Sequence, residues 1–470
     1  TTEIYTLSLH DALPIFRTRD FASAGSTPGP ETTVRFTGPA PRMEVVEPKD
    51  EILTDGDTLK LKAAVKPVAP GTMEYAVTGF VKWTAMSGGP GAWSAETTLP
   101  ATPGRYLVTF RFKSESGAVA LAHRVLRVRG DKVREAWTRD LGAGVLGAPV
   151  IWRDLVILPT TEKGVIALKL GDGKQAWKRD DGSGRIPGRI ALIGDTVFYG
   201  AGRTVHACDA RTGKTIWKRQ LGGAIIGGVV AGTGRVFAPA GEHVLFCLDA
   251  KSGAILWDYA VRLPIIMEPT VEGNIVAFGA MDGIVRAVDA TTGREIWANR
   301  VSQESDSYTT APYWPPVVVG GRVVVCKGTV GKEDHNLLAF NLSDGKAAWS
   351  RRLGVSLMRL ATSAGKDTIY ASVPQEGKRG VMALSPADGS TLWGRATGVG
   401  MSAGIASRGT IFLRDDSSVC RTDAAGGPFH WIYRASTGPQ GSLYGPPAYA
   451  VGDGIAVIGT MDGKAIALKW

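Results

Sequence analysis

The chain has 470 residues, enough for about three domains of ordinary size. Hydrophobic residues make up 44% and charged residues 21%, which is typical of folded globular chains and argues against disorder. The formal net charge is +10, but the basic residues are scattered, so we expect no nucleic-acid partner. The 61 glycines and 26 prolines follow no collagen period and favour many short strands over a helical bundle.

Cysteine and histidine spacing predicts neither a disulfide framework nor a metal site. The four cysteines are far apart along the chain, so we expect buried free thiols. The six histidines show no HxH, HExxH or Cys/His spacing. No apolar stretch is long enough to span a membrane, so we expect no membrane span.

The first 41 residues do not read as part of a folded domain. Residues 1–16 (TTEIYTLSLHDALPIF) lack the basic start and unbroken apolar core of a secretory signal, and they resemble translated sequencing adapter. We expect this segment to be non-native and the natural protein to continue upstream. Residues 17–41 are rich in Gly, Pro, Ser and Thr and predict a linker.

Residues 42–130 predict a small β-sandwich. The segment 105–113 (RYLVTFRFK) places Tyr106, Val108, Phe110 and Phe112 on one face at period two. Residues 58–65 and 118–128 read similarly, with turn residues between them. The spacing of its tryptophans and turns resembles the Ig-like or fibronectin-like modules of secreted bacterial enzymes, a resemblance that implies no catalytic residue.

Residues 131–470 contain a repeat with a period near 40. One tryptophan recurs in each copy, and we expect its indole to dock on the neighbouring copy: Trp137, Trp177, Trp217, Trp257, Trp297, Trp349, Trp393 and Trp431. The phrase before it reads VHACDARTGKTIW at 205–217 and VRAVDATTGREIW at 285–297. A fixed period of this length indicates one supersecondary unit stacked many times.

The repeated phrase predicts a hairpin, and two more short strands precede it. Asp209 is placed to bond nearby backbone amides in the turn, and Gly213 to adopt a positive φ. Four strands per repeat is a propeller blade. The last repeat ends before its tryptophan strand, while Trp137 has no preceding hairpin. We therefore predict an all-β fold, an eight-bladed β-propeller closed by pairing of the Trp137 strand with the C-terminal strand.

The motif A-x-D-x-x-T-G-x-x-x-W, as in residues 287–297, resembles the PQQ-like repeat. That family includes quinoprotein dehydrogenases and the outer-membrane assembly factor BamB. The resemblance implies a propeller but no particular activity, because fold does not determine function. The dehydrogenases often carry adjacent cysteines and Glu, Asn and Asp ligands for Ca²⁺ beside PQQ. No such set is apparent here, so we predict no cofactor.

The position two residues after each tryptophan is basic in five copies. One interpretation is a belt that binds anionic polymers or lipid head groups. In the other interpretation, these charges prevent the outermost strands of two molecules from pairing edge to edge, and the aliphatic part of each Arg side chain lies over apolar neighbours. We favour the second, because other residues interrupt the row at Tyr259, Asn299 and Tyr433. The basic members are Arg139, Arg179, Arg219, Arg351 and Arg395.

Bulky side chains where strands enter the central channel are the candidate ligand-binding residues. Aromatic and Arg residues at a ring's mouth suit an extended ligand, although they equally suit a plug of the channel. Glu268 is the one carboxylate at the start of an inner strand, and it pairs in our interpretation with Arg189 or Arg359. The full set is Arg189, Met267, Glu268, Tyr313, Trp314, Arg359, Met401 and Tyr444.

These observations predict a non-catalytic scaffold of the bacterial envelope or extracellular space that binds protein or glycan. We expect the protein to be a monomer. Two alternatives stay open. In the first alternative, the chain is the accessory C-terminal part of a secreted calcineurin-like metallophosphoesterase, a family whose metal motifs are absent from this sequence. In the second, the chain is a BamB-like assembly factor. Periplasmic or extracellular localisation follows from the resemblance alone.

Overall fold

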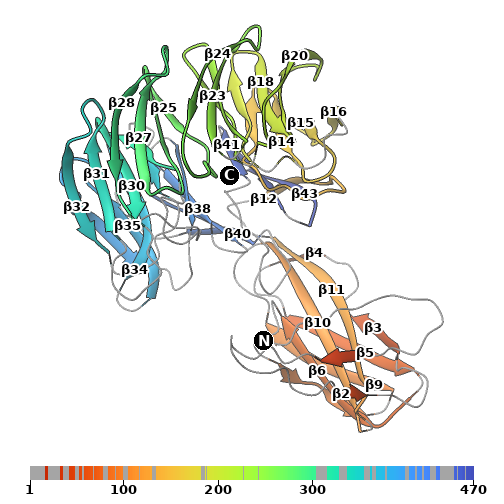
Figure 1. Cartoon of the computed structure of the whole chain (residues 1–470). Helices are drawn as coiled ribbons and strands as arrows, with labels where there is room; N and C mark the ends of the chain where they lie inside the picture. Colours follow the sequence, from red (N-terminus) through yellow and green to blue (C-terminus); the bar gives the residue numbers. More distant parts are fainter. Residues whose placement is uncertain are drawn as a thin grey trace. The chain divides into compact units, whose positions relative to one another are not determined.

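The structure, a computed structural model, describes residues 16–18, 32–34, 42–47, 52–54, 58–66, 68–77, 83–89, 91–98, 104–115, 117–129, 134–180, 186, 188–225, 227–241, 243–302, 315–327, 336–353, 360–362, 367–375, 378–396, 402–407, 410–414, 418–423, 430–434, 449–452, 454–460 and 462–469. The chain divides into two compact units, Thr1–Ala101 with Tyr106–Val128 and Thr102–Arg105 with Arg129–Trp470. All elements in the described ranges are strands (Figure 1), and none of these residues forms a helix long and apolar enough to cross a membrane.

The first unit consists of two sheets and a short hairpin. The hairpin pairs β1 (Phe16–Thr18) with β2 (Thr32–Val34); Phe16 ends the segment predicted to be non-native, and the other residues belong to the predicted linker. One sheet has the order β3 (Arg42–Glu47), β5 (Thr58–Lys66), β9 (Ala92–Thr98) and β8 (Ser87–Gly89). The other has the order β4 (Ile52–Thr54), β11 (Val119–Arg129), β10 (Gly104–Ser114), β6 (Gly71–Val77) and β7 (Thr84–Ala85).

Alternating apolar side chains from both sheets make the core of this unit. On β10, Val108, Phe110 and Phe112 are fully buried, as the period-two pattern predicts. They share one apolar cluster with Leu61 of β5 and Trp93 of β9. Each sheet therefore buries one face against the other, which is the arrangement of a β-sandwich. The Ig-like or fibronectin-like identity of the module stays a prediction.

The second unit is a succession of four-stranded antiparallel meanders. Six follow directly in chain order: β13 (Val150–Trp152), β14 (Leu155–Pro159), β15 (Val165–Lys169) and β16 (Gln175–Arg179); β17 (Ala191–Ile193), β18 (Thr196–Ala201), β19 (Thr204–Asp209) and β20 (Thr215–Gln220); β21 (Val230–Gly232), β22 (Arg235–Ala240), β23 (Val244–Asp249) and β24 (Ile255–Ala260); β25 (Thr270–Glu272), β26 (Ile275–Gly279), β27 (Ile284–Asp289) and β28 (Glu295–Arg300); β29 (Val317–Val319), β30 (Arg322–Lys327), β31 (Asn336–Asn341) and β32 (Ala347–Arg352); β33 (Ala361–Thr362), β34 (Ile369–Gln375), β35 (Lys378–Leu384) and β36 (Thr391–Ala396).

The remaining strands of this unit form a further meander and one sheet joined across the chain. The meander is β37 (Ser402–Ser407), β38 (Thr410–Arg414), β39 (Ser418–Asp423) and β40 (His430–Arg434). The joined sheet has the order β12 (Arg134–Asp140), β43 (Lys464–Lys469), β42 (Ile455–Gly459) and β41 (Tyr449–Gly452). The predicted pairing of the Trp137 strand with the C-terminal strand is therefore present, with Thr138 opposite Ile466.

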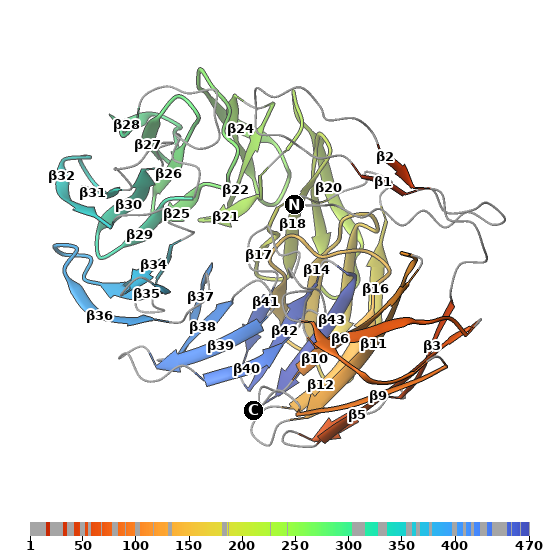
Figure 2. The same cartoon turned by 90° about the horizontal axis from the view of Figure 1, so that it is seen from below.

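The sheets follow one another around a common centre (Figure 2). First strands of successive sheets contact one another, as β17 does with β21, β21 with β25, and β25 with β29. In the six meanders from β13 to β36, the last strand carries the tryptophan and is the outermost of its sheet, because it pairs with the third strand alone. This is the architecture of a β-propeller, whose inner strands surround the axis.

The repeated tryptophan joins each sheet to the next. Its Nε1 donates a hydrogen bond of 2.8 to 3.1 Å to a main-chain oxygen in the third-to-fourth-strand turn of the following sheet. Because the acceptor belongs to a different sheet, the bond ties two blades together as well as satisfying the buried indole N–H. The donor–acceptor pairs are Trp137–Leu170, Trp177–Ala210, Trp217–Ala250, Trp257–Ala290, Trp297–Leu342 and Trp349–Pro386.

The same turn requires glycine for two reasons, its backbone conformation and the lack of space for a side chain. At Gly253, φ is +69°, a conformation that side chains other than glycine adopt at a penalty. A Cβ added there would lie 2.5 Å from Cε3 of Trp217, so the indole occupies the space that a side chain would need. Asp249 shapes the turn by accepting bonds from the Ser252 amide and hydroxyl at 2.8 and 2.7 Å. The same glycine–indole contact recurs at Gly173, Gly213, Gly293, Gly345 and Gly389.

Candidate functional site

Three short segments that lead into neighbouring inner strands lie against one another. They are residues 188–190 before β17, 227–229 before β21 and 267–269 before β25, which we call the mouth segments. A Cβ added at Gly228 would lie 2.6 Å from Cγ of Arg189. One added at Gly227 would lie 3.1 Å from the carbonyl carbon of Met267 and 3.2 Å from the amide nitrogen of Glu268. The absence of side chains at 227 and 228 thus permits this close approach.

The mouth segments bring together three of the predicted site residues. Arg189 is exposed, Met267 is half-buried, and Glu268 is buried with 5% of its surface accessible. The exposed guanidinium of Arg189 can contact an acidic group of a ligand, and the flexible thioether of Met267 can contact an apolar one. A buried carboxylate is expected to be paired, and the pairing of Glu268 with Arg189 or Arg359 stays a prediction. The other predicted site residues, Tyr313, Trp314, Arg359, Met401 and Tyr444, lie outside the described residues.

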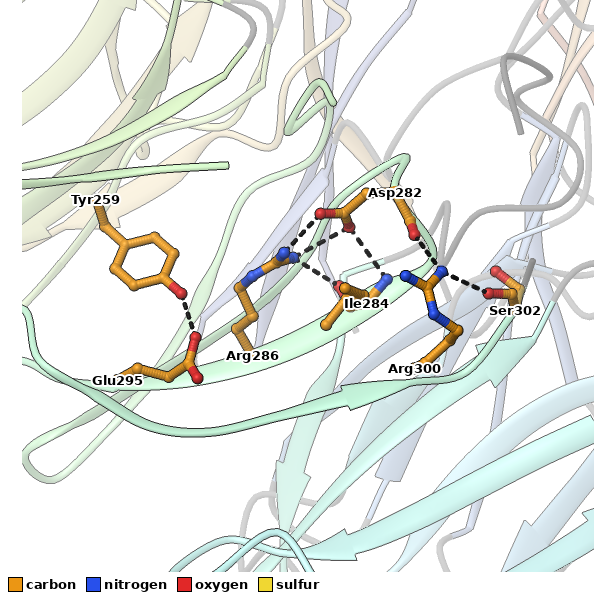
Figure 3. A network of polar contacts seen from close by, with 7 residues as sticks. All are labelled: Tyr259, Asp282, Ile284, Arg286, Glu295, Arg300 and Ser302. Carbon is orange, nitrogen blue, oxygen red and sulfur yellow. Dashed lines mark hydrogen bonds and ion pairs between the residues drawn. The ribbon is translucent and has the colours of Figure 1, made fainter. Parts of the chain in front are cut away.

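A buried ion pair stands in the turn before β27. The Arg286 guanidinium donates from Nη1 and Nη2 to the two oxygens of Asp282, at 3.0 and 2.5 Å (Figure 3). Their side chains are 9% and 2% exposed. Residues 281–283 form a turn, with Gly283 donating to the Ala280 carbonyl at 3.1 Å. The burial of the carboxylate and its bidentate partner was not predicted.

The ion pair belongs to a wider network around the same turn. Arg300 donates from Nη1 to the Asp282 carbonyl at 3.0 Å, so a second cation orders the turn through its main chain (Figure 3). Burial would lower the pKa of Arg286, but the hydrogen bonds and charge of Asp282 outweigh this effect and raise it overall. Arg286 is therefore fully protonated, and the pair is a fixed charge-assisted contact.

Tyr259 extends the network to the preceding sheet. Its hydroxyl, on β24, donates to a carboxylate oxygen of Glu295 on β28 (Figure 3). Its ring also contacts Phe278 edge-on, with centroids 5.7 Å apart. Burial, and then the neighbouring Glu295 carboxylate, raise the pKa of Tyr259 to about 12. Tyr259 is thus a neutral donor at every physiological pH, and it links two sheets.

The basic position after each tryptophan has a structural role that neither interpretation of the sequence anticipated. Arg139, Arg179 and Arg219 each donate to the carbonyl of the turn glycine in the next sheet, at distances from 2.7 to 3.1 Å. Arg351 makes the same bond to Gly389, and Asn299 makes it to Gly345 at 2.7 Å. These side chains latch neighbouring sheets together. The side chain of Arg395 lies outside the described part of the chain.

Cysteines and acidic groups offer little to a metal in the described part of the chain. Cys208, Cys247 and Cys326 are buried free thiols in three different sheets. Burial raises the pKa of both Cys247 and Cys326 to about 12, so these thiols stay protonated. Among the described residues no three His, Cys, Asp or Glu side chains are grouped to hold a metal ion.

Comparison with known proteins identifies the repeat. A family model described as "Outer membrane protein assembly factor BamB" matches residues 76–204, 201–356, 285–398 and 354–470. The chain belongs to this family.

Two kinds of curated relative align with short parts of the chain. BamB of Escherichia coli (strain K12) is 30% identical over 96 residues, which are 20% of this chain and 24% of that protein. The quinoprotein alcohol dehydrogenase PedH of Pseudomonas putida is 27% identical over 107 residues, 20% of this chain and 17% of that protein. The alignments span about a quarter or less of these two relatives, so they establish kinship of the repeat rather than a shared activity.

Solved structures agree on the fold. BamB from Moraxella catarrhalis is 20% identical, with a TM-score of 0.56, and the match covers 72% of this chain and 98% of that one. The quinohemoprotein alcohol dehydrogenase ADHIIG from Pseudomonas putida HK5 is 13% identical, with a TM-score of 0.55, and the match covers 72% of this chain and 76% of that one. At such identities the likeness shows the β-propeller alone.

The dehydrogenase relatives raise the question of PQQ with its Ca²⁺ ion. The described acidic side chains near the mouth do not fit such a group. Arg286 binds both carboxylate oxygens of Asp282, which leaves no strong ligand pair for a cation. Glu268 is buried on a single mouth segment, and among the described residues it belongs to no group of three or more His, Cys, Asp or Glu side chains that could hold a metal ion.

Proposed function

We propose that this protein is a non-catalytic scaffold of the bacterial envelope that assists the assembly of outer-membrane proteins by binding an unfolded substrate polypeptide. Membership of the family described as outer membrane protein assembly factors is the observation that carries this proposal. It favours the assembly-factor alternative over an accessory region of a phosphoesterase, and it supports a periplasmic location as part of the proposal.

The distribution of side-chain contacts supports the choice of the mouth as the binding surface. The recurrent tryptophan and the arginine found in five of the repeats are engaged in joining sheets, as Trp217 and Arg219 are through the carbonyls of Ala250 and Gly253. The mouth segments differ from sheet to sheet instead. An arginine, a glycine and a glutamate stand at equivalent positions, namely residues 189, 228 and 268. Specific recognition requires such differences.

We further propose that the propeller has eight blades and is closed by the β12–β43 pair. The support is that Trp137 of β12 donates to the Leu170 carbonyl at 2.8 Å, the same contact that joins the other sheets. Electron-microscopy projections along the central axis count the blades directly. Seven blades, or an open ring, would contradict this part of the proposal.

The binding proposal is tested with a fluorescently labelled outer-membrane β-barrel protein, unfolded in urea and diluted into the purified chain. Anisotropy should show saturable binding, and Arg189→Glu should weaken it roughly tenfold, as expected when a contact worth about 1.4 kcal/mol is lost. Lys218→Glu is the matched control, because Lys218 is exposed on the outermost strand β20. No binding, or equal weakening by both variants, would overturn the proposal.

A further inference from the structure

The outer strand β24 differs in charge from its counterparts. An outermost strand leaves backbone groups unpaired, and proteins commonly protect such edges with Lys or Arg. Every other outer strand carries at least one of them, whereas β24 (ILWDYA) has none and Asp258 as its only charge. The basic residues of the others are Arg134 and Arg139; Lys178 and Arg179; Lys218 and Arg219; Arg300; Arg351 and Arg352; and Arg395.

The exposed side of β24 is apolar. Ile255 and Leu256 are 44% and 47% exposed, and both are large aliphatic side chains. Leu256 is the extra residue of a β-bulge, since Trp257 and Ile255 are opposite consecutive residues of β23. The same bulge occurs in the neighbouring outer strands, so it does not set β24 apart. What distinguishes β24 from the other outer strands is the lack of a basic residue together with the adjacent aliphatic pair Ile255 and Leu256.

The lack of a basic residue in β24 does not leave its sheet loosely attached. Tyr259 occupies the position where other sheets have the latching arginine, and it bonds Glu295 of the next sheet instead. Trp257 keeps the common bond to the Ala290 carbonyl at 3.1 Å. The sheet is therefore docked without the charge, and its outer edge stays available for another contact.

We propose that β24 is a docking edge for an extended segment of a partner protein, which adds to it as a further β-strand. Edge strands recognise extended peptides through their unpaired backbone groups, and side chains supply specificity. Asp258 is exposed on this edge, so the partner segment carries a Lys or Arg near it and apolar residues over Ile255 and Leu256. A second copy of β24 offers no cation to Asp258, which disfavours self-association as the occupant.

This edge is separate from the mouth segments, and the proposal does not depend on binding there. The probe is a short labelled peptide that alternates valine and threonine around one central lysine, titrated with the full chain and followed by anisotropy. Leu256→Lys and Asp258→Lys should each weaken its binding about tenfold or more, because one removes apolar contact and the other reverses the charge.

Ile216→Lys is the matched control, because Ile216 stands in the same bulge position of β20 and is 48% exposed. A second control is the same peptide with N-methyl groups on alternate backbone nitrogens, which cannot pair along an edge and should not bind. The proposal is overturned if the unmodified peptide does not bind, if Ile216→Lys weakens it equally, or if the methylated peptide binds as well. Sedimentation showing a dimer that Leu256→Lys dissociates would also overturn it, by identifying a second copy as the occupant.

Discussion

Replacing Gly253 by alanine tests the joint between two sheets. The added methyl group would have to share its space with the indole of Trp217, because the built Cβ lies 2.5 Å from Cε3 and 2.6 Å from Cδ2. Neither atom can move alone, since both belong to a rigid ring whose Nε1 donates to the Ala250 carbonyl at 3.0 Å. The ring must therefore shift as a whole and weaken that hydrogen bond.

Two contributions add to the expected loss of stability. The backbone at Gly253 has φ of +69°, and a residue with a Cβ in this region costs about 1–2 kcal/mol. Forcing a methyl group into a packed joint costs about 1–3 kcal/mol more. We therefore expect Gly253→Ala to lower the free energy of unfolding by about 2–5 kcal/mol.

Gly234→Ala is the matched control. Gly234 has a similar φ of +73°, but no atom lies within 4 Å of its added Cβ. It should lose only the backbone contribution, about 1–2 kcal/mol. Urea unfolding followed by circular dichroism gives both values. Equal destabilisation by the two substitutions would refute the claim that the indole excludes a side chain at position 253.

Three further results are expected. Arg286→Met should destabilise the fold by about 3–5 kcal/mol, because it leaves the buried carboxylate of Asp282 unpaired. Adding Asp282→Asn to this variant should restore much of the lost stability. A urea titration that finds no restoration contradicts the ion-pair account. The Ser252 hydroxyl and amide hold the pKa of Asp249 below its usual 3.8, so the stability that Asp249 contributes is present above that pH and is lost as the pH falls through the lower folded value. The urea midpoint of the wild type should therefore drop more steeply in acid than that of Asp249→Asn. Parallel curves for the two proteins would argue against this role of Asp249. Cys247, with its pKa raised to about 12, should resist iodoacetamide in the native protein and react in urea, as mass spectrometry would detect; rapid native labelling would show that the thiol is accessible.

The fold was largely predictable because the repeat places the same residues in the same contacts. A tryptophan at fixed spacing from an Asp–Gly turn indicates a docked hairpin, and the structure pairs each such hairpin as expected. The pairing of the Trp137 strand with the C-terminal strand followed from counting incomplete repeats at the two ends. Both inferences depend on local patterns, which a sequence displays directly.

The latches and the buried ion pair were not predicted, for different physical reasons. Arg219 bonds a main-chain carbonyl of the next sheet, and a carbonyl has no sequence signature. Arg286 did leave a signal, since several equivalent positions hold apolar residues such as Ile166, Phe246 and Ile466, although β19 has His206 there; a cation at this buried place must find a partner. Its partner Asp282 lies in a turn that sequence alone reads as ordinary.

The location of the substrate polypeptide tests the proposed function most directly. A photo-reactive amino acid placed at Met267, in the mouth segments, should cross-link an unfolded outer-membrane β-barrel protein mixed with the chain. The same residue placed at Lys218 on the outermost strand β20 should yield no adduct above background. Mapping the adducts by mass spectrometry decides the matter: cross-links at Met267 alone are the predicted result, and cross-links absent there, or equal at both positions, would contradict binding at the mouth.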